Sequence, residues 1–137
     1  MFKTILFPVD QSRESREAAD TVANLVKTYD SRLMLLSVVE KTADGQGISQ
    51  GGIMTSTEAV AQLLQGAQAL FAEKGIEAEI IEREGKPPFV ICDVADEVNT
   101  ELIIMGSRGL GLTSEGTSES VTNLVINLAP CPILIIP

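Results

Sequence analysis

The chain alternates short apolar runs with longer segments in which apolar residues recur every three or four positions. Five runs predict β-strands, at about 4–9, 32–39, 78–83, 102–105 and 133–136. Four of them are almost wholly apolar, which is typical of parallel strands buried on both faces. The third, at 78–83, is mixed in polarity and predicts a strand at a sheet edge.

Helical spacing predicts four helices between these strands, at about 13–29, 57–74, 88–99 and 119–128. Ser12 suits the N-cap of the first helix, and Gly75 suits the C-terminus of the second. Two helices carry clear core stripes: Val60, Leu63, Leu64, Ala67, Leu70 and Phe71, then Val121, Leu124, Val125 and Leu128. The alternation predicts one α/β domain over 1–137, with an open parallel sheet and helices on both faces.

The segment 41–56 contains four glycines and few large apolar residues. A connection of this length without secondary structure is unusual in a small domain. It fits either a solvated connector or a lid over a binding site.

A strand, a glycine turn and a helix start follow one another near residue 106. Gly106 ends the strand, Gly109 follows three positions later, and a polar stretch leads to the last helix. Glycines let the backbone approach an anion closely, and free N–H groups at a helix start bind phosphate. Ligands of open α/β sheets lie beyond the carboxyl ends of the strands, so Asp10, after the first strand, is a second candidate.

Composition excludes several functions. The net charge of −9 argues against general nucleic-acid binding, which needs basic surface. The chain has no histidine, so it lacks a His general base and His-based zinc sites. Cys92 and Cys131 fit small buried hydrophobes better than a redox pair. No apolar run is long enough to span a membrane, and the N-terminus does not read as a signal peptide, so we expect a cytoplasmic protein.

Four stretches resemble the universal stress protein family along the whole chain. They are Ile5-Leu6-Phe7-Pro8-Val9-Asp10-Gln11-Ser12, Leu35-Leu36-Ser37-Val38-Val39, Ile103-Ile104-Met105-Gly106-Ser107-Arg108-Gly109-Leu110, and Ala129-Pro130-Cys131-Pro132-Ile133-Leu134-Ile135-Ile136. We accordingly expect a Rossmann-like sheet of the adenine nucleotide alpha hydrolase type, with strand order 3-2-1-4-5. The resemblance also implies a homodimer joined through Ile133–Ile136, an apolar strand whose free edge would invite pairing.

The nucleotide-binding branch of this family carries Gly, two residues, Gly, nine residues, then Gly and Ser or Thr. Gly106, Gly109 and Ser120 match this pattern, but Glu119 stands where the third glycine is expected. A carboxylate about 5 Å from a phosphate costs roughly 3 kcal/mol, about a hundredfold in affinity, which magnesium would offset in part. Alternatively, Glu119 complements the helix dipole with its side chain in solvent. We expect AMP or ADP to tolerate this residue better than ATP.

The resemblance implies an adenine nucleotide, AMP or ATP, as ligand. It places Pro8, Val9 and Asp10 beside the adenine and ribose, with Asp10 also able to hold Mg²⁺. It gives the backbone of Val38 to the adenine edge. It assigns the ribose and phosphates to Gly106, Arg108, Gly109, Ser120, Val121 and Thr122. Structural roles compete with three of these: Asp10 and Ser120 could simply cap helices, and Arg108 could pair with a surface carboxylate.

The leading hypothesis is a regulator or sensor of the stress response that binds an adenine nucleotide and is not an enzyme. The first alternative is an interaction module of the same fold without nucleotide, which Glu119 supports. A slow ATP hydrolase, with Asp10 or Glu119 positioning water, is the second alternative. A redox sensor built on the two cysteines ranks below both.

Overall fold

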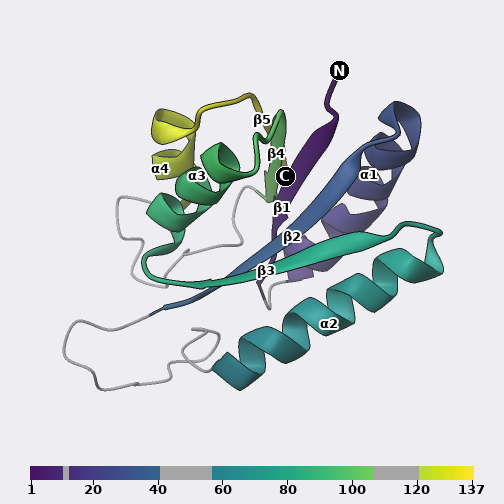
Figure 1. The fold of residues 1–137 in the computed structure, drawn as a ribbon, viewed down its shortest axis with the longest axis horizontal. Coiled ribbons are helices and arrows are strands. Elements are labelled where there is room, and N and C mark those ends of the chain that lie inside the picture. Colours follow the sequence, from purple (N-terminus) through teal and green to yellow (C-terminus); the bar gives the residue numbers. More distant parts are fainter. Residues whose placement is uncertain (11–12, 41–56, 107–120) are drawn as a thin grey trace.

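The computed structural model describes residues 1–10, 13–40, 57–106 and 121–137. Strands and helices alternate along the whole chain (Figure 1). The strands are β1 (Thr4–Pro8), β2 (Arg32–Val39), β3 (Ala78–Glu84), β4 (Leu102–Gly106) and β5 (Ile133–Ile136). The helices are α1 (Arg13–Tyr29), α2 (Thr57–Glu73), α3 (Pro87–Glu97) and α4 (Val121–Leu128). The predicted elements are confirmed to within two residues at most ends, while Ser12 and the segment 41–56 lie outside the described residues.

The five strands form one parallel sheet in the order β3-β2-β1-β4-β5, as predicted. β1 is the central strand, and β3 lies at one edge, as its mixed polarity indicated. The chain adds β2 and β3 on one side of β1, then returns to add β4 and β5 on the other. Because the direction of growth reverses at β1, the helices divide between the two faces of the sheet.

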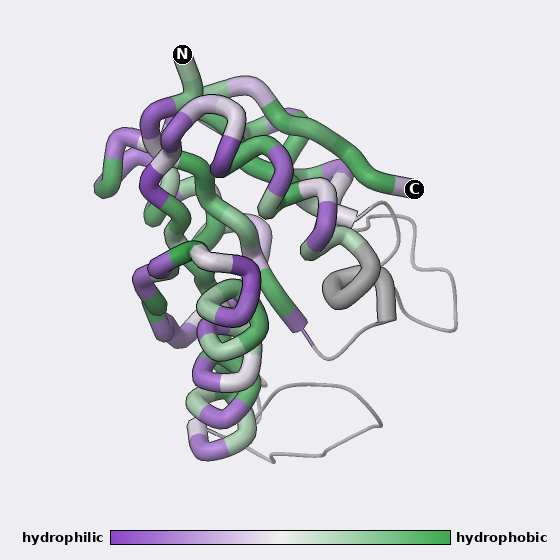
Figure 2. Tube along the Cα trace, turned by 90° about the vertical axis from the view of Figure 1, so that its right-hand side faces the viewer, coloured by the Kyte–Doolittle hydropathy of each residue, from purple (hydrophilic) through white to green (hydrophobic). Residues whose placement is uncertain are grey.

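Each face of the sheet has its own hydrophobic core. Helices α1 and α2 cover one face, where Phe7 and Phe71 pack edge to face with ring centres 6.1 Å apart. Helices α3 and α4 cover the other face, over Leu6 and Met105. Alternate residues of the central strands serve the two cores. In Figure 2 the strands are predominantly hydrophobic, whereas the helices alternate between hydrophilic and hydrophobic residues.

The helical stripes are buried less completely than the sequence predicted. On α2, Leu63, Ala67 and Leu70 are only partly buried, although they share the stripe with fully buried neighbours. On α4, Leu124 is partly buried and Leu128 is 48% exposed, so the prediction that Leu128 is a core residue is wrong. Helical spacing gives the direction of a side chain, but an end of a helix can extend beyond the sheet that would cover it.

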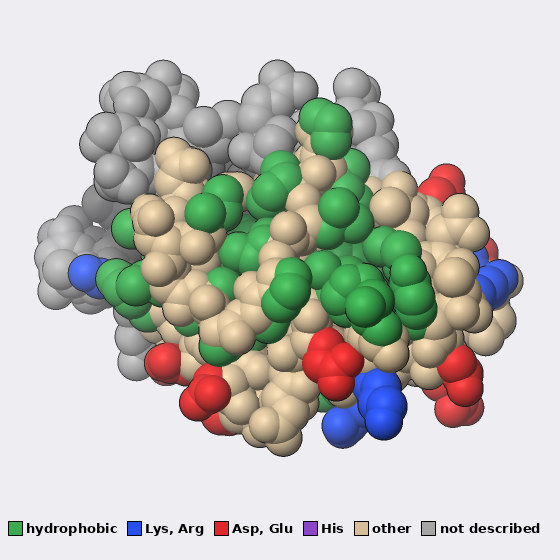
Figure 3. Space-filling model, turned by 90° about the horizontal axis from the view of Figure 1, so that it is seen from above, with side chains coloured by type: hydrophobic (Ala, Val, Ile, Leu, Met, Phe, Trp, Pro, Cys, Tyr) green, Lys and Arg blue, Asp and Glu red, His purple; other side chains and the backbone are tan. Residues whose placement is uncertain are grey.

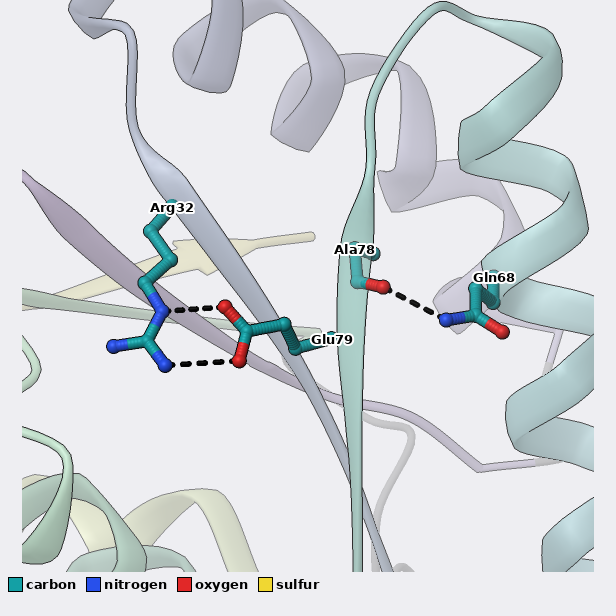
Figure 4. A network of polar contacts seen from close by, with 4 residues as sticks. All are labelled: Arg32, Gln68, Ala78 and Glu79. Atoms are coloured by element: carbon teal, nitrogen blue, oxygen red, sulfur yellow. Dashed lines mark hydrogen bonds and ion pairs between the residues drawn. The ribbon is translucent and has the colours of Figure 1, made fainter.

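Polar side chains fasten β3 and α2 at the edge of the sheet (Figure 4). The Arg32 guanidinium binds both carboxylate oxygens of Glu79 on β3, and one of these hydrogen bonds measures 2.8 Å. The Gln68 amide on α2 donates to the Ala78 carbonyl over 2.8 Å. These contacts fix α2 above the outer strands. Among the described helices, none is both long and apolar enough to cross a membrane.

Candidate functional site

The carboxyl ends of β1 and β4, called the crevice below, lie where the strand order of the sheet reverses. The register between these two strands joins Ile5 to Leu102 and Leu6 to Ile103. Between β1 and β2, by contrast, the register continues from Thr4 to Pro8. The ends of β1 and β4 therefore separate at the point where the growth of the sheet reverses, which is where open α/β sheets bind ligands.

The end of β1 is held in place by β2. The Val9 N–H donates to the Leu36 carbonyl over 2.8 Å, which continues the parallel register beyond Pro8. The Ser37 hydroxyl, only 1% exposed, donates to the Val9 carbonyl over 3.0 Å. Asp10 follows directly and is partly buried. Two bonds from β2 thus fix the backbone that carries the Asp10 carboxylate.

The backbone of Val38 faces the crevice side of β2. In a parallel strand, successive residues direct their N–H and C=O groups to opposite neighbours. The Leu36 carbonyl bonds to Val9, whereas the Val39 carbonyl accepts from the Gly85 N–H over 3.0 Å, on the side of β3. Val38 has the same parity as Leu36, so its polar backbone groups point toward the end of β1. Its side chain is 95% buried in the core of the α3/α4 face.

The start of α4 is tied to the end of β4. The Thr122 hydroxyl donates to the Gly106 carbonyl over 3.1 Å, and both Val121 and Thr122 are buried. This bond brings the first turn of α4, with its N–H groups and the positive end of its dipole, to the carboxyl edge of the sheet. Because the Thr122 hydroxyl donates its proton to Gly106, it can act toward a ligand only as a hydrogen-bond acceptor.

Two carboxylates meet at the same edge of the sheet. Burial raises the pKa of Glu40, which follows β2, and the nearby Asp10 carboxylate raises it further. Each effect disfavours the ionised form of Glu40. Within the described part of the chain, no group of three His, Cys, Asp or Glu side chains is arranged to hold a metal ion. Asp10 and Glu40 therefore form a pair of oxygen ligands at most, to which a bound phosphate would have to add others.

The structure gathers most of the predicted site residues at one edge. Pro8, Val9, Asp10, Val38, Gly106, Val121 and Thr122 all lie at the carboxyl ends of β1, β2 and β4 or at the start of α4. Arg108, Gly109, Glu119 and Ser120 lie outside the described residues.

Sequence reasoning missed Ser37 and Glu40. Ser37 is the one polar residue within the otherwise apolar run 33–39, which is a signal that could have been used. Glu40 follows the end of β2 directly, and Asp10 comes two residues after the end of β1. The expected strand order sets β1 beside β2, so it could have predicted that the two carboxylates lie close together.

The strand order and the helices on both faces define a Rossmann-like α/β domain, a fold whose ligands bind at the switch point of the sheet. A sequence model of the universal stress protein family matches residues 1–137. The chain is 63% identical over 137 residues to universal stress protein Sll1654 of Synechocystis sp., covering 100% of this chain and 87% of that protein. This protein therefore belongs to the universal stress protein family.

Solved structures agree with the fold. A universal stress protein in complex with cAMP superposes with a TM-score of 0.77 at 19% identity, covering 98% of this chain and 97% of the other. A family member from Arabidopsis thaliana with AMP bound gives a TM-score of 0.69 at 23% identity, covering 98% and 90%. At these identities the likeness concerns the fold.

Proposed function

We propose that this universal stress protein binds an adenine nucleotide in the crevice between β1 and β4 and acts as a regulator or sensor rather than an enzyme. The observation that carries the proposal is the convergence of a fixed carboxylate, outward-facing backbone groups and a helix start at one edge of the sheet. Structurally similar proteins bind cAMP and AMP, which supports an adenine nucleotide as the ligand class.

Each part of the crevice suits one part of such a ligand. The Val38 backbone offers a donor and an acceptor to the adenine edge, and Asp10 can accept from a ribose hydroxyl. Gly106 and the first turn of α4, with Val121 and Thr122, suit the phosphates. Arg108, Gly109 and Ser120 belong to the proposed site through their sequence pattern alone.

The acidic character of the edge favours a ligand with few phosphates. The carboxylates of Asp10 and Glu40 already repel one another, and Glu119 adds a carboxylate where the family pattern has glycine. These carboxylates repel AMP less than ATP, because AMP carries fewer negative charges. Mg²⁺ held by Asp10 would reduce the difference in affinity between the two nucleotides. Equal affinities for AMP and ATP, in both the native protein and the Glu119→Gly variant, would contradict this preference.

The first experiment is to denature the purified protein, identify any released nucleotide by mass spectrometry, and titrate AMP, ADP and ATP with Mg²⁺ by calorimetry. We expect Asp10→Asn to weaken binding roughly 10- to 100-fold, because a hydrogen bond to a charged group contributes about 1.5–3 kcal/mol. Asp96→Asn, on the exposed side of α3, is the matched control and should bind as the native protein does. No binding of any of the three nucleotides at millimolar concentration would overturn the proposal.

We also propose a homodimer joined through β5. Hydrophobic side chains gather on the face shown in Figure 3, over the part of the molecule where β5 lies. Leu134 on β5 is 36% exposed, and Ile126 and Leu128 on α4 are 51% and 48% exposed. A free apolar edge strand can pair with a second copy of itself across a two-fold axis.

The exposed face also favours a second candidate function. An apolar face of this kind suits a module that binds another protein, with or without nucleotide. If the protein binds no nucleotide yet remains a dimer, this alternative gains support, and Glu119 becomes the residue that closes the nucleotide site.

A further inference from the structure

A cavity of about 430 Å³ lies on the α1/α2 face of the sheet, away from the phosphate end of the crevice. Its lining includes Phe7 and Val9 from β1 and, from α2, Leu63, Ala67, Leu70 and Phe71. Phe7 and Val9 belong to the core beneath α1 and α2, whereas the proposed phosphate contacts lie at α4. The cavity is therefore distinct from the space assigned to the phosphates, although it shares Val9 and Asp10 with the part assigned to the adenine and ribose.

The packing of α2 explains why space remains beside α1. Helix α2 rests on β2 and β3, and the bond from Gln68 to the Ala78 carbonyl holds it there. At the far end, Lys74 bonds to Asp20 of α1 over 2.7 Å, which joins the two helices. The α2 residues Leu63, Ala67 and Leu70 remain only partly buried on this side of the helix.

Gly66 lines the cavity from the α2 side and is itself exposed. Glycine weakens the interior of a helix and is usually explained there by a close neighbour. At Gly66, however, a Cβ would meet no atom of the described residues within 4 Å outside its own helix backbone and chain neighbours. No backbone contact within the described residues thus accounts for the missing side chain, and the effect of the glycine is open space.

Among the described residues that line the cavity, most are apolar and two are polar. Phe7 and Phe71 form an aromatic floor, and the lining is otherwise almost entirely aliphatic. Asp10 and Gln62 also line it. Asp10 follows β1 and Gln62 lies in the early turns of α2, so both polar groups sit toward the carboxyl edge. One end of the cavity therefore offers hydrogen-bond acceptors, one of which is a carboxylate.

We propose that this cavity is a binding site for a small apolar molecule whose single polar head is a hydrogen-bond donor, an alcohol or an ammonium group. An engineered apolar cavity of about 150 Å³ holds one benzene molecule. The volume of about 430 Å³ thus suits two to three fused or linked rings, or an alkyl chain of comparable size. The acceptors select the head group, and the carboxylate of Asp10 disfavours an anionic one. Nucleotide binding is not required for this site.

The test uses the neutral fluorophore N-phenyl-1-naphthylamine, which has an apolar body and one N–H donor. We expect saturable binding to the native protein and at least a tenfold loss of affinity in Gly66→Leu, whose side chain fills the cavity. The open space at Gly66 predicts an unchanged or higher melting temperature for this variant, and its AMP titration should match that of the native protein. Gln65→Leu adds the same side chain at the adjacent position, which is not among the described lining residues, and should bind the fluorophore normally.

Two outcomes would overturn the proposal. Equal binding by the native protein, Gly66→Leu and Gln65→Leu would place the fluorophore on the exposed surface instead. No binding by the native protein would mean that the chain itself fills the cavity. Competition tests the head group: decylamine or decanol should displace the fluorophore at lower concentration than decanoate, and the reverse order would contradict the role of the acceptors.

Discussion

Each edge strand of the sheet exposes one large apolar side chain to a similar extent, but the two strands differ in what surrounds it. On β3, Ile80 is 40% exposed, and on β5, Leu134 is 36% exposed. β3 also carries charged side chains: Glu79 pairs with Arg32, and Arg83 lies 3.3 Å from Glu97. β5 consists of four aliphatic residues, with no charge among them.

This difference shows that the neighbours of an exposed hydrophobic residue decide whether its edge can form an interface. Charges on an edge strand oppose pairing with another chain, because docking would strip them of water. The β3 edge is protected in this way, and the β5 edge is not. Of the two edges, β5 is therefore the one at which we expect self-association.

The largest expected effect follows from placing a charge on the unprotected edge. In a symmetric dimer, Leu134→Lys would remove two buried leucines, each contributing about 1.5–3 kcal/mol, and would bring two ammonium groups together. We expect the dimer dissociation constant to rise at least a hundredfold, giving a monomer at micromolar concentration. Sedimentation equilibrium measures the mass directly.

Ile80→Lys is the matched control, because it makes the same kind of change at similar exposure on the opposite edge. Its mass should equal that of the native protein. If Ile80→Lys dissociates the protein and Leu134→Lys does not, the two edges have been assigned the wrong way round.

The sheet was predicted well from the sequence, because a buried strand requires apolar residues at successive positions. A central parallel strand must be apolar on both faces, and Ile103 and Ile104 are both fully buried on opposite faces. Gly75 was equally readable, since its φ of +83° is a conformation that glycine adopts freely. The order of the strands, in contrast, came from the family resemblance.

The site was less readable, because its geometry depends on strands that are distant in sequence. Nothing local shows that Glu40 lies beside Asp10, or that the Ser37 hydroxyl bonds to Val9. The cavity was also hidden. A helical stripe indicates which side of α2 faces inward, but not whether Leu63 and Leu70 reach another side chain there.

Glu40 offers a second test, since a carboxylate near a like charge should behave oppositely to a paired edge carboxylate such as Glu79. The raised pKa of Glu40 means that its ionisation opposes folding. We expect Glu40→Gln to raise the free energy of unfolding at pH 7 by about 0.5–1 kcal/mol. The gain should shrink as the pH falls through the raised folded-state pKa, and vanish below about 4.5, the ordinary value. Urea titrations from pH 4 to pH 7 measure it, with exposed Glu73→Gln as the control for net charge.

The smallest expected effect concerns the ion pair that marks the protected edge. The Arg32 guanidinium lowers the pKa of Glu79, so this pair stabilises the fold at neutral pH and stops doing so as the pH falls through the lowered value. Both side chains are about half exposed, so solvent screens them. We expect Glu79→Gln to lower the free energy of unfolding at pH 7 by on the order of 0.3 kcal/mol, with the loss disappearing in 1 M NaCl. A loss several times larger, or one that persists in salt, would mean that the pair holds β3 in place. Its main effect would then not be to keep the edge from pairing.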